Sequence, residues 1–172
     1  MTSTARPVVV LVGTMGAGKT TVGRLVADRL GVPFRDTDQD VEAVAGRSVP
    51  DIFIESGETE FRRLEAAAVA AALSGYDGVL ALGGGALLDA RTRDRLAGHR
   101  VVFLRVGLSD AAKRVGLGVS RPMLLGNVRG RIKQLLDERN PVYESVATDV
   151  VETDGRVVGQ VADEVLGLLG AP

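Results

Sequence analysis

The chain has 172 residues, of which 45% are hydrophobic and 25% charged, with a formal net charge of −1, so we expect one globular domain over residues 1–172 and no binding of nucleic acid. It has no cysteine, which excludes disulfides, thiolate metal sites and thiol nucleophiles. The N-terminal residues lack an apolar signal core and no apolar run reaches membrane-spanning length, so we expect a cytoplasmic protein without a membrane partner.

The first predicted elements are a strand, a glycine-rich loop and a helix. Residues 7–12 form a β-branched run typical of a buried strand, and residues 21–30 carry apolar side chains near helical spacing. Between them, Gly13 to Thr20 fits the phosphate-binding pattern G-x-x-x-x-G-K-[ST]. In this arrangement backbone N–H groups converge on a polyphosphate, Lys19 contacts its β- and γ-phosphates, and the Thr20 hydroxyl ligates Mg²⁺. The chain is therefore predicted to bind a nucleoside triphosphate.

The rest of the chain alternates strands with helices. Strands are predicted at 32–35, 78–82, 100–106 and 148–152, and helices at 39–45, from Ser48 to a break at Gly57, and at 58–73, 89–97, 109–114, 128–139 and 157–169. The helix at 128–139 is expected to stop before Pro141. Residues 115–126 lack periodicity and contain three glycines, which is typical of a lid or binding loop. This alternation predicts a parallel sheet covered on both faces, with ligands at the carboxyl ends of its strands.

Two carboxylates follow the strand predicted at 32–35. Asp36 and Asp38 are two residues apart, so in extended backbone their side chains point the same way. One carboxylate can orient Mg²⁺ while the other accepts the proton of an attacking hydroxyl. The alternative is that Asp38 merely caps the next helix.

Other polar and glycine residues extend this pattern. Arg62, beside the scarce aromatic Phe61, is predicted to hold a substrate carboxylate, the alternative being a solvated helical arginine. The Gly83–Gly85 run costs backbone entropy and is expected where a ligand approaches the backbone. Arg121 in the long loop is a candidate lid arginine that neutralises phosphoryl charge, and otherwise a solvated one. His99 is expected to be a solvated loop histidine rather than a general base.

Together these residues resemble the shikimate kinase family. The resemblance rests on motifs in the family's order and spacing, namely Gly13 to Thr20, Asp36-Thr37-Asp38, Gly57-Glu58-x-x-Phe61-Arg62-x-x-Glu65, Leu82-Gly83-Gly84-Gly85, Arg121-Pro122 and Arg139-x-Pro141-x-Tyr143. It implies an α/β fold with three α/β/α layers, a central five-stranded parallel sheet in the order 2-3-1-4-5, a substrate-binding region at about 36–65 and a flexible lid at about 115–126. It also implies that a monomer transfers the γ-phosphoryl group of ATP to the 3-hydroxyl of shikimate, in the synthesis of aromatic amino acids.

The resemblance further implies roles for individual residues. The catalytic residues would be Asp38 as base, Lys19, and Arg121 from the lid. ATP would contact Gly16, Ala17, Gly18, Lys19, Thr20, Thr21, Arg114, Arg121 and Arg156, with Arg114 stacked on adenine. Shikimate would contact Asp36, Asp38, Phe53, Phe61, Arg62, Gly83, Gly84, Gly85 and Arg139, with the two arginines on its carboxylate and Glu65 positioning Arg62. Thr20 and Asp36 would hold Mg²⁺.

Alternatives remain open at this point. A kinase of the same fold could act on another small hydroxy acid such as gluconate, although the pair Arg62 and Arg139 disfavours a neutral acceptor and the short lid disfavours a nucleoside monophosphate. A non-catalytic nucleotide-binding regulatory domain would need neither Asp38 nor Arg121. Residues 153–156 lack the proline that family members often place against adenine, which leaves the adenine contact open.

Overall fold

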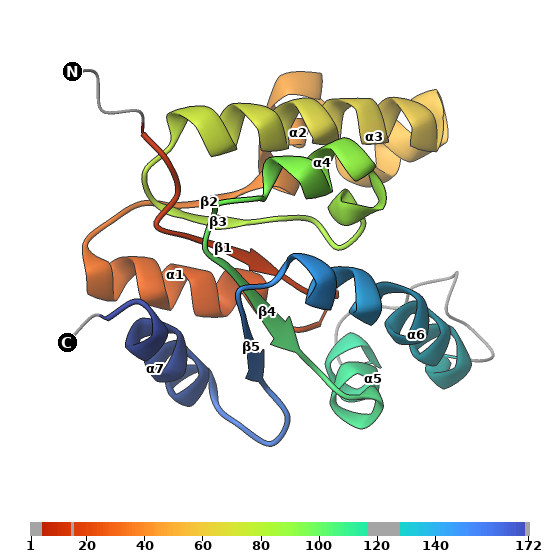
Figure 1. Ribbon diagram of the computed structural model, residues 1–172. Coiled ribbons are helices and arrows are strands. Elements are labelled where there is room, and N and C mark those ends of the chain that lie inside the picture. The colour runs from red at the N-terminus through yellow and green to blue at the C-terminus, as the bar shows by residue number, and fades with distance from the viewer. Residues whose placement is uncertain (1–4, 15, 117–127, 171–172) are drawn as a thin grey trace.

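The computed structural model describes residues 5–14, 16–116 and 128–170, and within them five strands form one sheet (Figure 1). The strands are β1 (Val9–Val12), β2 (Phe34–Asp36), β3 (Val79–Ala81), β4 (Val101–Arg105) and β5 (Asp149–Glu152). They lie in the order β2-β3-β1-β4-β5, and every neighbouring pair is parallel. The predicted α/β class and strand order are confirmed.

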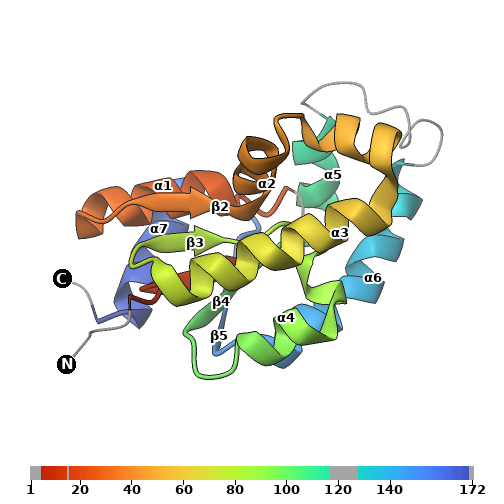
Figure 2. The same ribbon diagram turned by 90° about the horizontal axis from the view of Figure 1, so that it is seen from above.

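Helices cover both faces of this sheet. They are α1 (Lys19–Leu30), α2 (Thr37–Ala45), α3 (Val49–Gly75), the short 3₁₀ helix η1 (Ala86–Leu88), α4 (Ala90–Arg95), α5 (Leu108–Gly116), α6 (Val128–Val146) and α7 (Val158–Leu168). Helices α1 and α7 lie on one face and α3 with α4 on the other (Figure 1). Seen from above, the long α3 runs across its face of the sheet (Figure 2).

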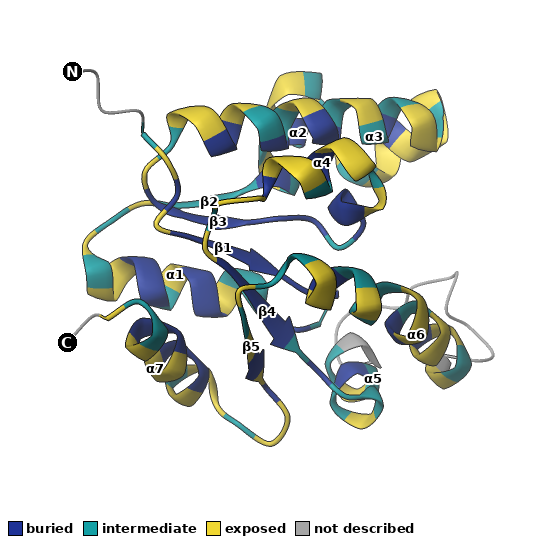
Figure 3. Cartoon of the chain, in the orientation of Figure 1, coloured by how far each residue is buried: buried dark blue, intermediate teal, exposed yellow. Residues whose placement is uncertain are grey.

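The core is split into two layers by the central strands. All four residues of β1 are buried, which is typical of a parallel strand covered on both faces. Val9 and Leu11 pack toward α1 and α7, whereas Val10 and Val12 pack with residues of α3 and with Tyr143 of α6. The dark strands and inner helix faces in Figure 3 show this division. Helices therefore pack against both faces of the sheet whose strands end at the site.

The helix boundaries follow local signals in several places. Gly31 ends α1 in the left-handed conformation, with φ of 69°. The Ser48 side chain accepts a hydrogen bond from the Asp51 N–H at 3.3 Å and so caps α3, which begins where the helix was predicted to start. Gly57 interrupts α3 with a φ of 86°, which matches the predicted break between two helices.

Other boundaries differ from the prediction. Helix α2 begins at Thr37 rather than at residue 39, because Asp36 caps it by accepting the Asp38 N–H at 2.8 Å. Asp38 therefore lies in the first helical turn. The prediction that Asp36 and Asp38 share an extended backbone is wrong, and so is the alternative that Asp38 caps the helix. Helix α6 does not stop before Pro141 but continues to Val146. The proline removes one helical hydrogen bond, yet the turns beyond it carry Tyr143 into the core at 1% exposure.

Two smaller differences lie on either side of β4. The segment Ala86–Leu88 forms η1, which the sequence pattern did not predict. Helix α5 includes Val115 and Gly116, which were predicted as loop; a glycine is tolerated most easily in the last turn of a helix. In the part of the chain that the structure describes, no helix combines the length and apolar character required to cross a bilayer.

Candidate active site

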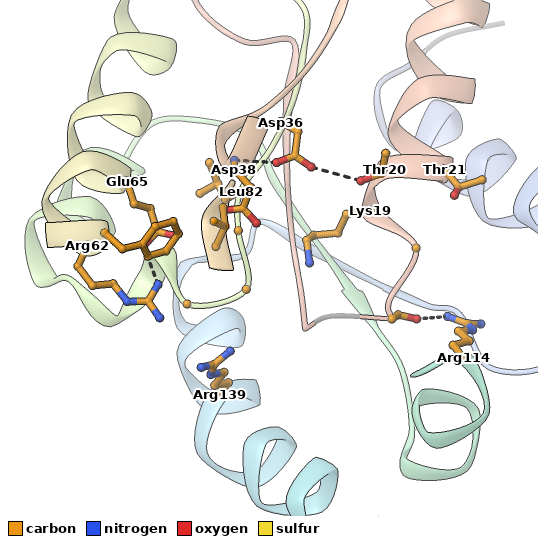
Figure 4. Close-up of a pocket in the computed structure, with 17 residues that line it drawn as sticks. Lys19, Thr20, Thr21, Asp36, Asp38, Arg62, Glu65, Leu82, Arg114 and Arg139 are labelled. Carbon is orange, nitrogen blue, oxygen red and sulfur yellow. Dashed lines mark hydrogen bonds and ion pairs between the residues drawn. The ribbon is translucent and has the colours of Figure 1, made fainter. Parts of the chain in front are cut away.

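A cavity of about 520 Å³ opens at the carboxyl ends of the strands (Figure 4). It collects side chains or backbone from the phosphate loop, α2, α3, the turn after β3, α5 and α6. Its lining residues are Gly16, Gly18, Lys19, Thr20, Thr21, Asp36, Asp38, Val49, Phe61, Arg62, Glu65, Leu82, Gly83, Gly84, Gly85, Arg114 and Arg139. Most of the predicted site residues are thus brought together in one place.

The phosphate loop is shaped by glycines with positive φ. Gly16 and Gly18 have φ of 86° and 90°, values that residues with a Cβ rarely adopt. Gly18 is the N-cap of α1 and has no side chain to occupy the N–H groups of the first helical turn. Those N–H groups and the helix dipole form a site for an anion.

Lys19 points into the phosphate loop. Its ammonium donates to the carbonyl oxygens of Gly13 at 2.5 Å and Thr14 at 3.1 Å. Burial lowers the pKa of Lys19 to about 8, against the raising effect of the Asp36 and Asp38 carboxylates. A phosphate entering the loop would give this desolvated ammonium a direct counter-charge.

Oxygen donors suited to Mg²⁺ lie beside the loop. The Thr20 hydroxyl donates to Oδ2 of Asp36 at 3.3 Å, while Oδ1 of Asp36 accepts the Asp38 N–H (Figure 4). Mg²⁺ is usually held by one or two such oxygens together with water and substrate phosphates. Thr20 and Asp36 therefore fit this ion.

Asp38 is the carboxylate with an unused oxygen. Burial raises its pKa, and the neighbouring Asp36 charge raises it further, while Lys19 and Arg62 oppose the shift. Its Oδ1 is buried and has no hydrogen-bond partner among the residues that the structure describes. A buried acceptor without a partner destabilises the folded chain, so this oxygen is suited to accept a hydrogen bond from a hydroxyl of a bound molecule.

Arg62 is held by a buried carboxylate. Its Nη1 donates to Oε1 of Glu65 at 2.8 Å, one helical turn further along α3, and Glu65 is only 3% exposed. Burial raises the pKa of Glu65, an effect that the Arg62 charge opposes. Arg139 approaches the same cavity from α6, and Figure 4 shows the two guanidinium groups coming from different helices. Two cations at one end of the cavity suit a carboxylate.

Charged side chains lie against two glycines of the Gly83–Gly85 turn. A Cβ on Gly83 would be 2.5 Å from Oδ1 of Asp38, and one on Gly85 would be 2.5 Å from the guanidinium of Arg62. None of the three has a positive φ. The sequence led us to expect a ligand close to this backbone. In the structure, the charged side chains of the protein itself already lie that close.

Arg114 joins the phosphate loop to the connection between β5 and α7. Its Nη1 donates to the Gly16 carbonyl at 2.9 Å, and its Nη2 donates to the Thr153 carbonyl at 3.2 Å. A second hollow of about 390 Å³ adjoins this point, and it is lined by Ala17, Gly18, Thr21, Val22, Arg114, Thr153, Arg156, Val157, Val158 and Val161. Its mostly apolar walls beside the phosphate loop suit a flat heterocycle.

Several predicted residues lie elsewhere. Phe53 is 37% exposed and does not line the main cavity, although its ring centroid is 4.7 Å from that of Phe61. Arg156 lines only the second hollow and pairs with Glu164 at 2.8 Å. His99 lies between α4 and β4, and it is not among the cavity residues. Arg121 and most of the predicted lid lie outside the described residues.

Sequence reasoning missed two apolar lining residues, Val49 and Leu82. Val49 is the first residue of α3, and Leu82 follows β3 directly. Neither belongs to a polar pattern. The position of Leu82 after a buried strand was the available signal, because ligands gather at the carboxyl ends of parallel strands.

Comparison with known proteins agrees with this geometry. Residues 15–169 match the family model described as shikimate kinase. The chain is 58% identical over 165 residues to the shikimate kinase of Salinispora arenicola, covering 96% of this chain and 99% of that one. It is 56% identical over 159 residues to the shikimate kinase of Thermobifida fusca, covering 92% of each. A solved structure of shikimate kinase from Acinetobacter baumannii in complex with shikimate superposes with a TM-score of 0.88 at 36% identity, covering 96% of this chain and 93% of that one.

Proposed function

Because the chain belongs to the shikimate kinase family and is an ATP-dependent kinase of shikimate, we propose which of its residues carry the reaction. The matches extend over nearly the whole chain and do not favour a gluconate kinase or a non-catalytic regulatory domain. The observation that carries the proposal is the meeting, in one cavity, of the phosphate loop with Asp38 and the two arginines Arg62 and Arg139.

The phosphate loop binds the triphosphate of ATP. The N–H groups at the start of α1 donate hydrogen bonds to the phosphate oxygens, and Lys19 exchanges the Gly13 and Thr14 carbonyls for the β- and γ-phosphates. Thr20 and Asp36 hold Mg²⁺, which supplies positive charge to the phosphates when it is bound.

The acceptor is held at the opposite end of the cavity. Arg62 and Arg139 bind the carboxylate of shikimate through charge-assisted hydrogen bonds, and the Glu65 ion pair sets the direction of the Arg62 fork. Phe61 lines the wall beside them, in contact with Phe53. Oδ1 of Asp38, which has no partner among the described residues, then accepts a hydrogen bond from the 3-hydroxyl.

Transfer follows from this placement. As the hydroxyl oxygen forms its bond to the γ-phosphorus, its proton moves to the carboxylate of Asp38, and the bond to the β-phosphate oxygen breaks to release ADP. Lys19 balances the charge that grows on the leaving phosphate. The raised pKa of Asp38 makes its carboxylate a better base than an exposed aspartate.

The adenine of ATP occupies the second hollow. Arg114 covers it from α5, and Arg156 and the valines of the α7 start form the other wall. Because Arg114 is already fixed by the Gly16 and Thr153 carbonyls, its guanidinium needs little reorganisation to stack on the base. We also propose that the enzyme acts as a monomer, since residues of a single chain line both the phosphate and the acceptor ends of the described cavity, and that it works in the cytoplasm.

An ADP-release assay tests the function. Purified protein with Mg-ATP should release ADP with shikimate but not with gluconate or without an acceptor, and ³¹P NMR should assign the new ester to the 3-hydroxyl. Omitting Mg²⁺ should abolish turnover. Equal ADP release in all three mixtures would overturn the substrate assignment, and light scattering would settle the oligomeric state.

A further inference from the structure

The backbone of the Gly83–Gly85 turn is already engaged in several hydrogen bonds. The Gly83 and Gly85 carbonyls accept the N–H groups of Ala86 and Leu88 at 3.1 Å, which starts the short helix η1. Two further bonds come from side chains that are distant in sequence. Those two side chains decide where the turn sits relative to the rest of the cavity.

The first is Thr37. Its Oγ1 accepts the Gly83 N–H at 3.2 Å, across a sequence separation of 46 residues, and Thr37 is completely buried. Thr37 lies between Asp36 and Asp38 at the start of α2. This bond therefore fastens one end of the turn to the segment that carries both carboxylates.

The second is Tyr143. Its hydroxyl donates to the Gly84 carbonyl at 2.5 Å, and its ring is buried against Phe103 of β4 with centroids 5.1 Å apart. Arg139 lies one turn earlier on α6, and its charge opposes the rise that burial causes in the pKa of Tyr143. The Tyr143 hydroxyl thus binds the middle of the turn and feels the charge of an arginine of the acceptor site.

Displacement of the turn would be transmitted to the acceptor groups. Asp38 and Glu65 lie against Gly83, and Arg62 lies against Gly85, at distances that leave no room for a Cβ. A shift of a few tenths of an ångström in this backbone would move a carboxylate or a guanidinium. The turn is a common support for all of these charged groups.

We propose that Thr37 and Tyr143 are positioning residues that hold the Gly83–Gly85 turn, and through it the shikimate site, in binding geometry. The proposal rests on the proposed assignment of the acceptor site. Neither side chain lines the cavity. Both act through the backbone that the acceptor groups lie against.

The test removes one hydroxyl at a time. Tyr143→Phe keeps the ring in the core, and it should raise KM for shikimate by about 5- to 30-fold while KM for ATP stays unchanged. The chain has two tyrosines, and the other provides a matched control. Tyr76 donates to the Val79 carbonyl at 3.2 Å, at the opposite end of β3. Tyr76→Phe should change neither KM.

Thr37 is tested with two substitutions. Thr37→Val keeps the shape of the side chain and removes the hydroxyl, so it should raise KM for shikimate. Thr37→Ser keeps the hydroxyl, so its KM for shikimate should equal that of the parent. The serine variant separates the positioning role of the hydroxyl from packing, because serine keeps the hydroxyl but lacks the methyl group. If Tyr143→Phe fails to fold, this pair still decides the matter.

Two outcomes would overturn the proposal. One is that Tyr143→Phe and Tyr76→Phe have equal effects on KM for shikimate. The other is that KM for ATP rises in parallel with KM for shikimate in Tyr143→Phe and Thr37→Val. Failure of the proposed function is distinguishable, since it would appear in the parent protein as ADP release independent of shikimate.

Discussion

Two glycine-rich turns line the cavity, and they need glycine for different reasons. In the phosphate loop, Gly13, Gly16 and Gly18 have positive φ, and a Cβ on Gly18 would meet only the Val22 side chain at 3.9 Å. In the Gly83–Gly85 turn φ is ordinary, but a Cβ on Gly83 would collide with Asp38 and one on Gly85 with Arg62. Backbone conformation requires glycine at Gly16 and Gly18, whereas space requires it at Gly83 and Gly85.

This difference reflects how the two halves of the site are built. The phosphate half is one continuous segment of the chain, whose own N–H groups would bind the phosphates under the proposed function. The acceptor half combines side chains from α2, α3 and α6 around a backbone turn. Substitutions in the phosphate half should therefore act through backbone strain and ATP, and those in the acceptor half through displaced side chains and shikimate.

The largest expected effect belongs to Asp38. Asp38→Asn removes the proton acceptor but keeps the shape of the side chain, so kcat should fall by about 10²- to 10⁴-fold with shikimate binding retained. Steady-state kinetics and a binding titration measure the two quantities. A variant with nearly parental kcat would assign the base elsewhere.

Arg62→Ala should produce the next largest effect. Loss of a charge-assisted hydrogen bond costs about 1.5–3 kcal/mol, which raises KM for shikimate roughly 10- to 150-fold and leaves ATP binding intact. The neighbouring Arg63 is exposed and paired with Glu60, so Arg63→Ala is the control and should behave as the parent. Arg139→Ala should resemble Arg62→Ala. Weakened ATP binding in both would contradict the division of the cavity into two halves.

The glycines themselves provide the direct comparison. Gly85→Ala should displace only the flexible end of Arg62, raising KM for shikimate roughly tenfold with little change in Tm. Gly18→Ala should instead strain the backbone by about 1–2 kcal/mol and lower Tm by roughly 2–8 °C. Kinetics and thermal melts on the two variants separate these effects. Similar losses of Tm in both would show that the two turns do not differ as described.

The smallest effects concern stability against pH, where the two halves have opposite signs. The pKa of Asp38 is raised by folding, so the folded chain binds this proton more tightly and stability falls as the pH rises above the ordinary aspartate value. The pKa of Lys19 is lowered from 10.5 to about 8, so stability falls as the pH drops through that interval. Tm measured against pH should become flatter in Asp38→Asn on the acid side and in Lys19→Met between pH 8 and 10.5. Curves parallel to the parent would contradict both assignments.

The sequence by itself determined the features that depend on neighbouring residues. The phosphate loop is continuous, and its strand, glycines and helix follow one another, so local rules predicted it. The helix start at Ser48 and the break at Gly57 were predicted for the same reason. The alternation of strands and helices was enough for the fold class, and the motif resemblance supplied the strand order.

Only the tertiary structure decided the features that depend on distant contacts. Sequence proximity gave no sign that Thr37 bonds Gly83 or that Tyr143 bonds Gly84, since 46 and 59 residues separate these pairs. Local rules likewise predicted that α6 would end before Pro141. The helix continues because burial of Tyr143 outweighs the loss of one helical hydrogen bond. Asp38 turned into the cavity, where its Oδ1 has no hydrogen-bond partner in the part of the chain that the structure describes. Packing of segments far apart in the chain places these groups, and a local pattern contains no information about it.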